Sequence, residues 1–249
     1  MSCPEILWLT PPSRWPLYGS EIHVWAANLR VSVEKLAGFE STLSMDEQER
    51  AGRFHFEPDR NDFVSGRGIL RAILGSYLKI EPNQVHFEYG AFGKPILANQ
   101  TANSRLHFNL AHSDGVFLTA VSRLCPVGVD VEHNRMIANP DDLVKQVLSK
   151  TEAVDWQSLP NDSKTAAFYN LWTRKEACLK ATGDGITERL QEFAVSFMPD
   201  EPARVVKSPE MLPSTGGWTV IELNPVPGYT AALAVPNSEF NLSCWQWPH

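Results

Sequence analysis

The sequence repeats itself weakly at an offset of 105 residues, and this repeat constrains the fold more than any other feature. Ser44 and Glu47 have counterparts in Ser149 and Glu152. Both pairs have the S-x-x-E spacing of a capping box, which starts a helix. The same offset aligns Phe63 with Phe168, Ala72 with Ala177, Leu74 with Leu179, and the strand-like segment 23–27 with 128–132. The order of strand, capped helix and long helix therefore occurs twice, which predicts two similar lobes.

The hydrophobic pattern predicts the elements of each lobe. In the first half, residues 21–28 read as a strand, and apolar residues near helical spacing predict a long helix over 58–78. In the second half, a strand at 127–132 and a long helix at 164–181 repeat this order. The other expected elements are short helices at 44–54, 140–148 and 150–158, and strands at 85–89, 106–110, 116–122, 193–197, 218–223 and 229–235. The sequence thus predicts an α+β protein with one sheet-and-helix lobe at 1–123 and a similar one at 124–249.

The composition excludes several classes of protein. A net charge of −7 argues against nucleic-acid binding, because phosphate backbones require a broad basic surface. No apolar run reaches the roughly 18 residues of a membrane helix, and the start of the chain lacks the basic region of a signal peptide. The four cysteines are far apart, with no CxxC pair, and predict neither a zinc site nor a disulfide framework. We expect a cytoplasmic protein that binds neither nucleic acid nor membrane.

Three acidic residues could hold a metal ion. Asp130 and Glu132 are two apart on an expected strand, so their side chains share one face, and their mutual repulsion favours a nearby cation. Glu176 lies four residues before Lys180 on an expected helix. Such an all-oxygen set suits Mg²⁺ or Mn²⁺. The residues alone leave two other interpretations open: a solvated acidic strand end for the first pair, and a surface salt bridge for Glu176 and Lys180.

Basic residues of the first half could bind a phosphate. Five arginines fall within 22 residues: Arg50, Arg53, Arg60, Arg67 and Arg71. A polyanionic small molecule could use such a local cluster even on an acidic protein. The segment 92–95 predicts a tight turn, in which Gly93 permits close backbone approach, and His112 follows the expected strand 106–110. A solvated charged face, and structural roles for the turn and the histidine, remain the alternatives.

Four motifs follow one another along the chain: Phe92-Gly-Lys-Pro95, Phe108-Asn-Leu-Ala-His-Ser113, Val127-Gly-Val-Asp-Val-Glu132 and Trp172-Thr-Arg-Lys-Glu-Ala-Cys-Leu-Lys180. Together they resemble the 4′-phosphopantetheinyl transferase family, in its larger pseudo-dimeric class that activates surfactin-type synthetases. The resemblance covers nearly the whole chain, and the last two motifs are specific as a pair. Ala111 departs from the family pattern, which has Ser or Thr before the histidine, and this puts one side-chain hydrogen bond to the nucleotide in doubt.

The resemblance implies both a fold and a site. The fold is two similar lobes related by a pseudo-twofold axis, with the nucleotide end of coenzyme A on the first lobe and the metal and catalytic acids on the second. Asp130, Glu132 and Glu176 would bind the metal, and Glu176 and Lys180 would be catalytic. Arg50 and His112 would lie near the 3′-phosphate. The implied coenzyme A site comprises Arg50, Tyr89, Ala91, Phe92, Gly93, Lys94, Asn109, Leu110, Ala111, His112, Asp130, Lys175, Glu176 and Lys180.

The implied reaction moves the phosphopantetheine arm of coenzyme A to a serine of an apo acyl or peptidyl carrier protein and releases 3′,5′-ADP, as in a holo-[acyl-carrier-protein] synthase. The carrier brings the nucleophile, which agrees with the lack of a G-x-S-x-G motif in this chain. The expected context is fatty-acid, polyketide or nonribosomal peptide synthesis, and one cleft per chain predicts a monomer. Two alternatives remain: a metal-dependent phosphohydrolase that uses the same acids, and a non-catalytic module that binds coenzyme A or a carrier protein.

Overall fold

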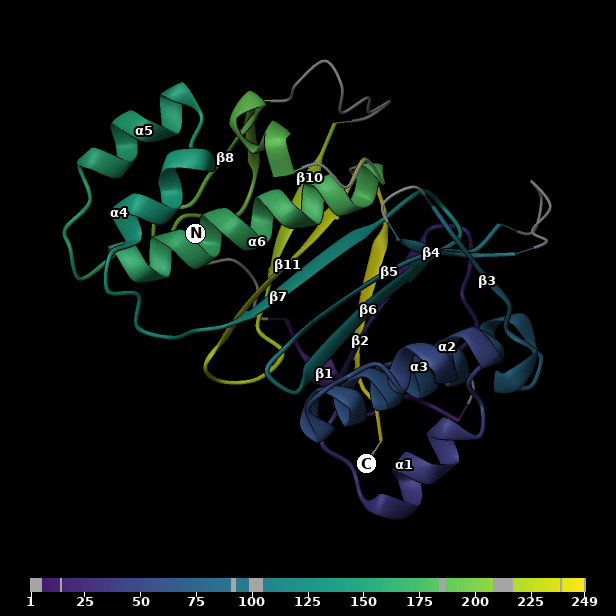
Figure 1. The fold of residues 1–249 in the computed structure, drawn as a ribbon. Coiled ribbons are helices and arrows are strands. Elements are labelled where there is room, and N and C mark those ends of the chain that lie inside the picture. Colours follow the sequence, from purple (N-terminus) through teal and green to yellow (C-terminus); the bar gives the residue numbers. More distant parts are fainter. Residues whose placement is uncertain are drawn as a thin grey trace.

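The computed structural model of the chain describes residues 6–13, 15–90, 93–98, 105–183, 187–207, 217–237 and 239–248. Two lobes lie side by side, with strands in the centre and the long helices α3 and α6 on either side (Figure 1). The first lobe is built from β2 (Glu21–Asn28), α1 (Val33–Glu40), α2 (Met45–Ala51), α3 (Glu57–Leu78), η1 (Pro82–Gln84), β3 (Phe87–Tyr89), β4 (Pro95–Leu97), β5 (His107–Ser113) and β6 (Val116–Ser122).

The second lobe repeats the order of the first. It consists of β7 (Gly128–His133), α4 (Pro140–Leu143), η3 (Val144–Gln146), α5 (Lys150–Gln157), α6 (Lys164–Thr182), η4 (Thr187–Glu192), β8 (Ala194–Val195), β9 (Val205–Lys207), β10 (Thr219–Leu223) and β11 (Tyr229–Val235). The sheets have matching strand orders, β2-β6-β5 and β7-β11-β10, and each lobe carries an antiparallel strand pair, β3-β4 or β8-β9. This correspondence confirms the expected α+β fold of two similar lobes related by a pseudo-twofold axis.

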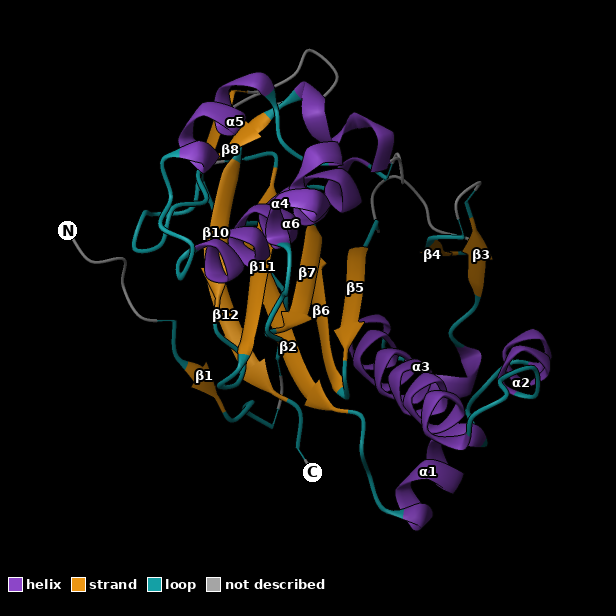
Figure 2. Cartoon of the chain, turned by 60° about the vertical axis from the view of Figure 1, so that its left-hand side comes forward, coloured by secondary structure: helices purple, strands orange, loops and turns teal. Residues whose placement is uncertain are grey.

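The core has a helix–sheet–sheet–helix arrangement, which both ribbon views show (Figure 2). One face of the first sheet packs on α3 through residues such as Trp25 and Ile73. The other face, which includes Val24, packs against Val129 and the second sheet. The outer face of the second sheet packs on α6. Residues that alternate along β2 and β7 therefore face two different cores.

The two ends of the chain complete the first sheet. The strand β12 (Asn241–Gln246) pairs in parallel with β2, and β1 (Trp8–Leu9) pairs in parallel with β12. The segment 241–246 falls in the second of the two expected lobes by sequence, yet its hydrogen bonds are to the first. The division at residues 123 and 124 stays a prediction.

Sequence-based boundaries match the long elements and miss several short ones. The strands at 21–28, 116–122 and 229–235 are confirmed, and α3 and α6 begin or end within one residue of expectation. The expected helix 140–148 is instead α4 followed by η3. The strand expected at 106–110 continues to Ser113, so His112 lies within β5 rather than after it. The pattern did not predict α1, β4, β9 or β12.

Each lobe buries the glutamate of its capping box beside a cation from the long helix. Glu152 accepts a hydrogen bond from the Ser149 N–H at 2.7 Å, and its Oε2 lies 2.6 Å from Lys175 Nζ, which is fully buried. In the first lobe, Glu47 makes the equivalent capping contact with Ser44. The repeated S-x-x-E pattern thus marks both a helix start and a buried ion pair.

Substitution Glu152→Gln should destabilise the protein by about 3–5 kcal/mol, because it leaves the Lys175 ammonium buried without a counter-charge. Urea unfolding measures this loss. Glu49→Gln is the matched control, since Glu49 and Arg53 form an exposed pair 3.8 Å apart, and it should leave the midpoint unchanged. Equal midpoints for both variants and the wild type would show that the buried pair does not hold the lobe together.

Candidate active site

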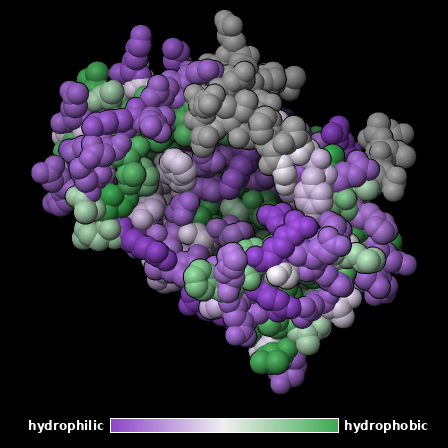
Figure 3. Space-filling model, viewed as in Figure 1, coloured by the Kyte–Doolittle hydropathy of each residue, from purple (hydrophilic) through white to green (hydrophobic). Residues whose placement is uncertain are grey.

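The candidate site lies where the two lobes meet along β5 and β7. These strands run side by side, because Asn109 Oδ1 accepts a hydrogen bond from the Val129 N–H at 2.9 Å and Ser113 Oγ accepts one from the His133 N–H at 3.2 Å. The surface is hollowed between the lobes, with hydrophilic side chains in the hollow (Figure 3). Side chains from both lobes therefore face one cleft.

The acids and Lys180 are brought together by the packing of α6 on β7. Along β7, Val129 and Val131 point into the core between the sheets, so Asp130 and Glu132 point toward α6. Lys180 Nζ donates to Asp130 Oδ1 at 2.6 Å. Glu176 lies one helical turn before Lys180 on the same side of α6. The expected grouping of the three acids with Lys180 is thus what the two elements produce.

Burial shifts the pKa values of these carboxyl groups. It raises the pKa of Asp130 to about 7, and the charges of Glu132 and Glu176 add to this, against the opposing ion pair with Lys180. Burial and the charge of Glu132 likewise raise the pKa of Glu176, with Lys180 again opposing. Among the described residues, neither Asp130 Oδ2 nor Glu176 Oε1, both buried, accepts a hydrogen bond. The cluster is therefore short of positive charge and of donors.

The donor chemistry of this cluster suits a hard divalent cation, which prefers carboxylate oxygens. The two unpartnered buried oxygens are the observation that favours such a group. In the part of the chain that the structure describes, however, no three Asp, Glu, His or Cys side chains already stand in metal-binding geometry. Lys180 pairs with Asp130, and Glu132 accepts a hydrogen bond from Ser113 Oγ at 3.0 Å. Cation binding would thus require these side chains to reorient.

The strand pair β3-β4 reaches from the first lobe to the end of α6. Gly93 has φ +73°, a conformation that favours glycine, and the Gly90 N–H donates to the Lys94 carbonyl at 3.0 Å. Lys94 Nζ then donates to the Lys180 carbonyl at 2.5 Å. Burial and the charge of Lys180 lower the pKa of Lys94. The turn expected at 92–95 therefore places the ammonium group of Lys94 against the second lobe.

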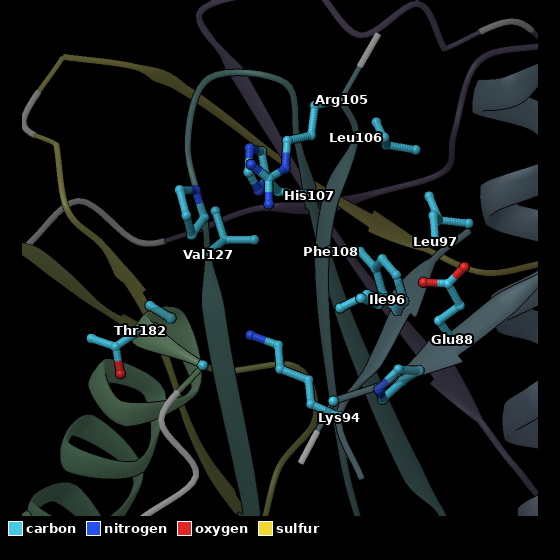
Figure 4. A pocket seen from close by; sticks show the side chains of 15 residues that line it. Glu88, Lys94, Ile96, Leu97, Arg105, Leu106, His107, Phe108, Val127 and Thr182 are labelled. Atoms are coloured by element: carbon cyan, nitrogen blue, oxygen red, sulfur yellow. The ribbon is translucent and has the colours of Figure 1, made fainter. Parts of the chain in front are cut away.

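A cavity of about 590 Å³ lies at this end of the cleft. Figure 4 shows Lys94, the residue before β4, extending into it toward Val127 and Thr182, and His107 also lines it. Burial and the charges of Arg105 and Lys94 lower the pKa of His107 to about 4, so its ring is neutral at physiological pH. The cavity has room for part of a small-molecule ligand next to Ala181 and Thr182 at the end of α6, whereas none of the three acids lines it.

His112 and Arg50 mark the first-lobe side of the cleft. The His112 side chain reaches solvent. Even so, desolvation by the surrounding protein and the charge of Lys180 lower its pKa, and Arg50 lowers it further. The charges of Asp62 and Glu132 act in the opposite direction. The Arg50 guanidinium is exposed and lies 5.2 Å from the centre of the Phe63 ring. His112 therefore sits within electrostatic reach of both Arg50 and the acid cluster.

Lys175 is not brought to the cleft. Its fully buried Nζ donates to Glu152 and to the carbonyls of Val147, Leu190 and Phe193, at 2.6–2.9 Å. Because all three ammonium hydrogens are engaged inside the second lobe, the expected contact of Lys175 with coenzyme A is wrong. One step along a helix turns a side chain by about 100°, so Lys175 points in a different direction from its neighbour Glu176.

The motif around β5 contributes mostly through its backbone and its packing. Asn109 bridges to β7, Leu110 packs on the first-lobe core, and Ala111 packs between the sheets. Position 111 thus faces the core between the two lobes. Tyr89 lies on β3. Ala91 and Phe92, also expected at the site, lie outside the described residues.

Ser113 was not predicted, although it holds both Glu132 and the backbone of β7. The period-two alternation of a strand could have identified it, because Asn109, Ala111 and Ser113 then share the face toward the second lobe. The expectation that the strand ended at residue 110 hid this signal.

Two family models match the chain. One, described as the 4′-phosphopantetheinyl transferase superfamily, matches residues 126–234, and one described as 4′-phosphopantetheinyl transferase, N-terminal, matches residues 30–123. The chain is 40% identical over 240 residues to 4′-phosphopantetheinyl transferase HetI of Nostoc sp., covering 96% of this chain and 98% of the relative. It is 26% identical to 4′-phosphopantetheinyl transferase Sfp of Bacillus subtilis, covering 84% of this chain and 89% of that relative.

The chain therefore belongs to the 4′-phosphopantetheinyl transferase family, in its larger, two-lobed class. It is an enzyme of this family, and neither the phosphohydrolase nor the non-catalytic alternative is favoured by these relatives. Within the described residues, every helix is too short or too polar to cross a bilayer.

The raised pKa of Asp130 predicts a pH dependence of stability in the metal-free protein. Unfolded Asp130 ionises near its ordinary pKa of 3.8, whereas the folded protein retains the proton up to about pH 7. The folded state thus binds more protons in this window, and the free energy of unfolding should fall as pH rises through it, by a few kcal/mol at most.

Urea unfolding in EDTA from pH 4 to 8 measures this slope, with Asp130→Asn as the control that cannot titrate. The stability of the wild type relative to this variant should decline across the range. A difference that stays constant with pH would show that Asp130 ionises normally in the fold.

Proposed function

We propose that the inter-lobe cleft binds coenzyme A with its nucleotide end on the first lobe and its pyrophosphate at the acids of the second, and transfers the phosphopantetheine arm to a serine of an apo carrier protein. The observation that carries this proposal is the cluster of Asp130, Glu176 and Lys180, with two buried oxygens that accept no hydrogen bond among the described residues. Membership of the family supplies the substrate class.

Asp130, Glu132 and Glu176 would hold Mg²⁺ or Mn²⁺ in this cleft. When bound, such a cation neutralises charge on the pyrophosphate oxygens. Lys180, released from its ion pair with Asp130, would add a fixed positive charge to the same phosphates. The shortage of positive charge around the acids supports this assignment. Each carboxylate disfavours ionisation of its neighbours, and a bound cation would remove that repulsion.

Glu176 is the proposed proton acceptor. The serine Oγ of the carrier attacks the β-phosphorus of coenzyme A, a new O–P bond forms, and the P–O bond to the α-phosphate breaks to release 3′,5′-ADP. The serine proton passes to Glu176. A raised pKa suits this role, because a base with a pKa nearer to neutral holds the abstracted proton better than an ordinary carboxylate.

Arg50, Lys94 and His112 would hold the nucleotide end. The neutral His112 ring can donate a hydrogen bond to the 3′-phosphate, while Arg50, exposed at the end of α2, supplies charge. Tyr89, Gly93 and the backbone of β5 would line the adenosine. The proposal includes the lobe division at residues 123 and 124 and activity as a monomer. It also includes a cytoplasmic location without binding to nucleic acid or membrane. The carriers modified would belong to fatty-acid, polyketide or nonribosomal peptide synthesis.

Transfer should require a divalent cation and Asp130. Incubation of the protein with coenzyme A, Mg²⁺ and an apo carrier should add one phosphopantetheine to the carrier, which mass spectrometry detects. Excess EDTA should abolish the addition because it removes the cation that balances the charge of the pyrophosphate. Asp130→Ala should also abolish it, because it removes a ligand of that cation. Loss of coenzyme A without carrier modification would indicate the phosphohydrolase, and unhindered transfer in EDTA would defeat the metal assignment.

Arg50→Ala should weaken binding of coenzyme A roughly tenfold or more, because it removes a charge-assisted contact to the 3′-phosphate. The same substitution should affect 3′-dephospho-coenzyme A much less. Calorimetric titration of both ligands makes the comparison, with the exposed Arg53→Ala as the matched control. Equal losses for the two ligands would place Arg50 away from the 3′-phosphate.

A further inference from the structure

The buried capping-box glutamates of the two lobes are used in different ways. In the second lobe, Glu152 pairs with Lys175, whose other partners are backbone carbonyls of the same lobe. Among the described residues, the partners of Glu152 and Lys175 all belong to the second lobe. In the first lobe, Glu47 pairs with two arginines of α3, Arg67 and Arg71, and one of these extends toward the candidate site.

Arg67 links this buried acid to the strand pair that carries Lys94. Its Nε donates to Glu47 Oε1 at 2.5 Å, and its Nη2 donates to the Tyr89 hydroxyl at 2.6 Å. The guanidinium also lies 4.6 Å from the centre of the Phe87 ring and 5.8 Å from that of Tyr89. Arg67 is itself buried, with 8% of its surface exposed, so these contacts exclude most water.

The same glutamate fixes the helix that carries Arg50. Glu47 Oε2 accepts the Ser44 N–H at 3.0 Å, which closes the capping box at the start of α2, and also accepts from Arg71 Nε at 2.7 Å. Arg50 lies one turn further along α2. One buried carboxylate therefore ties together α2, α3 and, through Arg67, the strand β3.

A stabilising role alone does not account for this arrangement. A buried ion pair stabilises a fold no better than well-packed apolar residues would, because both charges lose their hydration. A fork-shaped guanidinium with donors directed at two different elements instead fixes their separation and orientation. Here the two elements carry Arg50 and Lys94, the cations assigned to the nucleotide.

We propose that Arg67 is a positioning residue for the nucleotide end of coenzyme A, which holds the Tyr89 hydroxyl and α2 at a fixed spacing so that Arg50 and Lys94 reach one ligand. This inference rests on the proposed function. Tyr89 then acts through its bond to Arg67, and its hydroxyl does not contact coenzyme A. Tyr89 is 42% exposed as a residue, so Tyr89→Phe can remove the hydroxyl with little effect on packing.

A double-mutant cycle tests the proposal with Arg67→Met, Tyr89→Phe and the double variant. Loss of the charged hydrogen bond should raise the KM and the calorimetric Kd for coenzyme A about tenfold in each single variant, with kcat unchanged. The double variant should be no worse than Arg67→Met. Arg53→Met, at an exposed arginine paired only loosely with Glu49, is the control and should keep the wild-type KM.

The outcomes separate this inference from the proposed function. Wild-type KM in Tyr89→Phe, or additive losses in the double variant, would overturn the positioning role, the latter because the hydroxyl would then bind the ligand directly. A wild type that binds no coenzyme A and modifies no carrier would instead refute the proposed function. If Arg67→Met does not fold, Arg67→Lys keeps the charge beside Glu47 and takes its place in the cycle.

Discussion

The site depends on the close approach of α6 to β7 at Gly128. A Cβ atom at this position would lie 2.0 Å from the Ala177 carbonyl oxygen and 2.5 Å from the Ala181 nitrogen, so no side chain fits between helix and strand. Two residues further along β7, Asp130 is consequently within 2.6 Å of Lys180, and Glu176 lies on the same side of the helix. The crowding that raises the pKa of Asp130 follows from this one backbone contact.

Buried acids in this protein fall into two kinds, and the difference separates structure from function. Glu152 is satisfied by Lys175 and by the N–H groups of Ser149 and Val195. Asp130 and Glu176 each retain a buried oxygen that, within the described ranges, accepts no hydrogen bond. An incompletely paired buried carboxylate costs stability, and such groups gather at functional sites. The acids of the cleft thus retain oxygens that can still bind a ligand, whereas the oxygens of Glu152 are already paired within the second lobe.

Local patterns predicted much of the fold and part of the site. A capping box forms within one helical turn, so the local sequence shows it, and its repetition predicted two similar lobes. Alternation along 128–132 correctly put Asp130 and Glu132 on one face of the strand. The role of Lys175 was mispredicted, because a motif read as a line of letters does not show which way each helical side chain points. The pairing of β12 with β2 depends on contacts between residues far apart in the sequence, which periodicity cannot detect.

If the acid cluster performs the chemistry rather than supporting the fold, the substitution Glu176→Gln separates the two roles. Glutamine keeps the size of the side chain but removes its charge and its basic oxygen. We predict that kcat for carrier modification falls by roughly 10²–10⁴-fold while the thermal midpoint does not fall. A rate within about threefold of wild type would contradict the chemical role, since a surface pair with Lys180 contributes only a few tenths of a kcal/mol to stability and nothing to the rate.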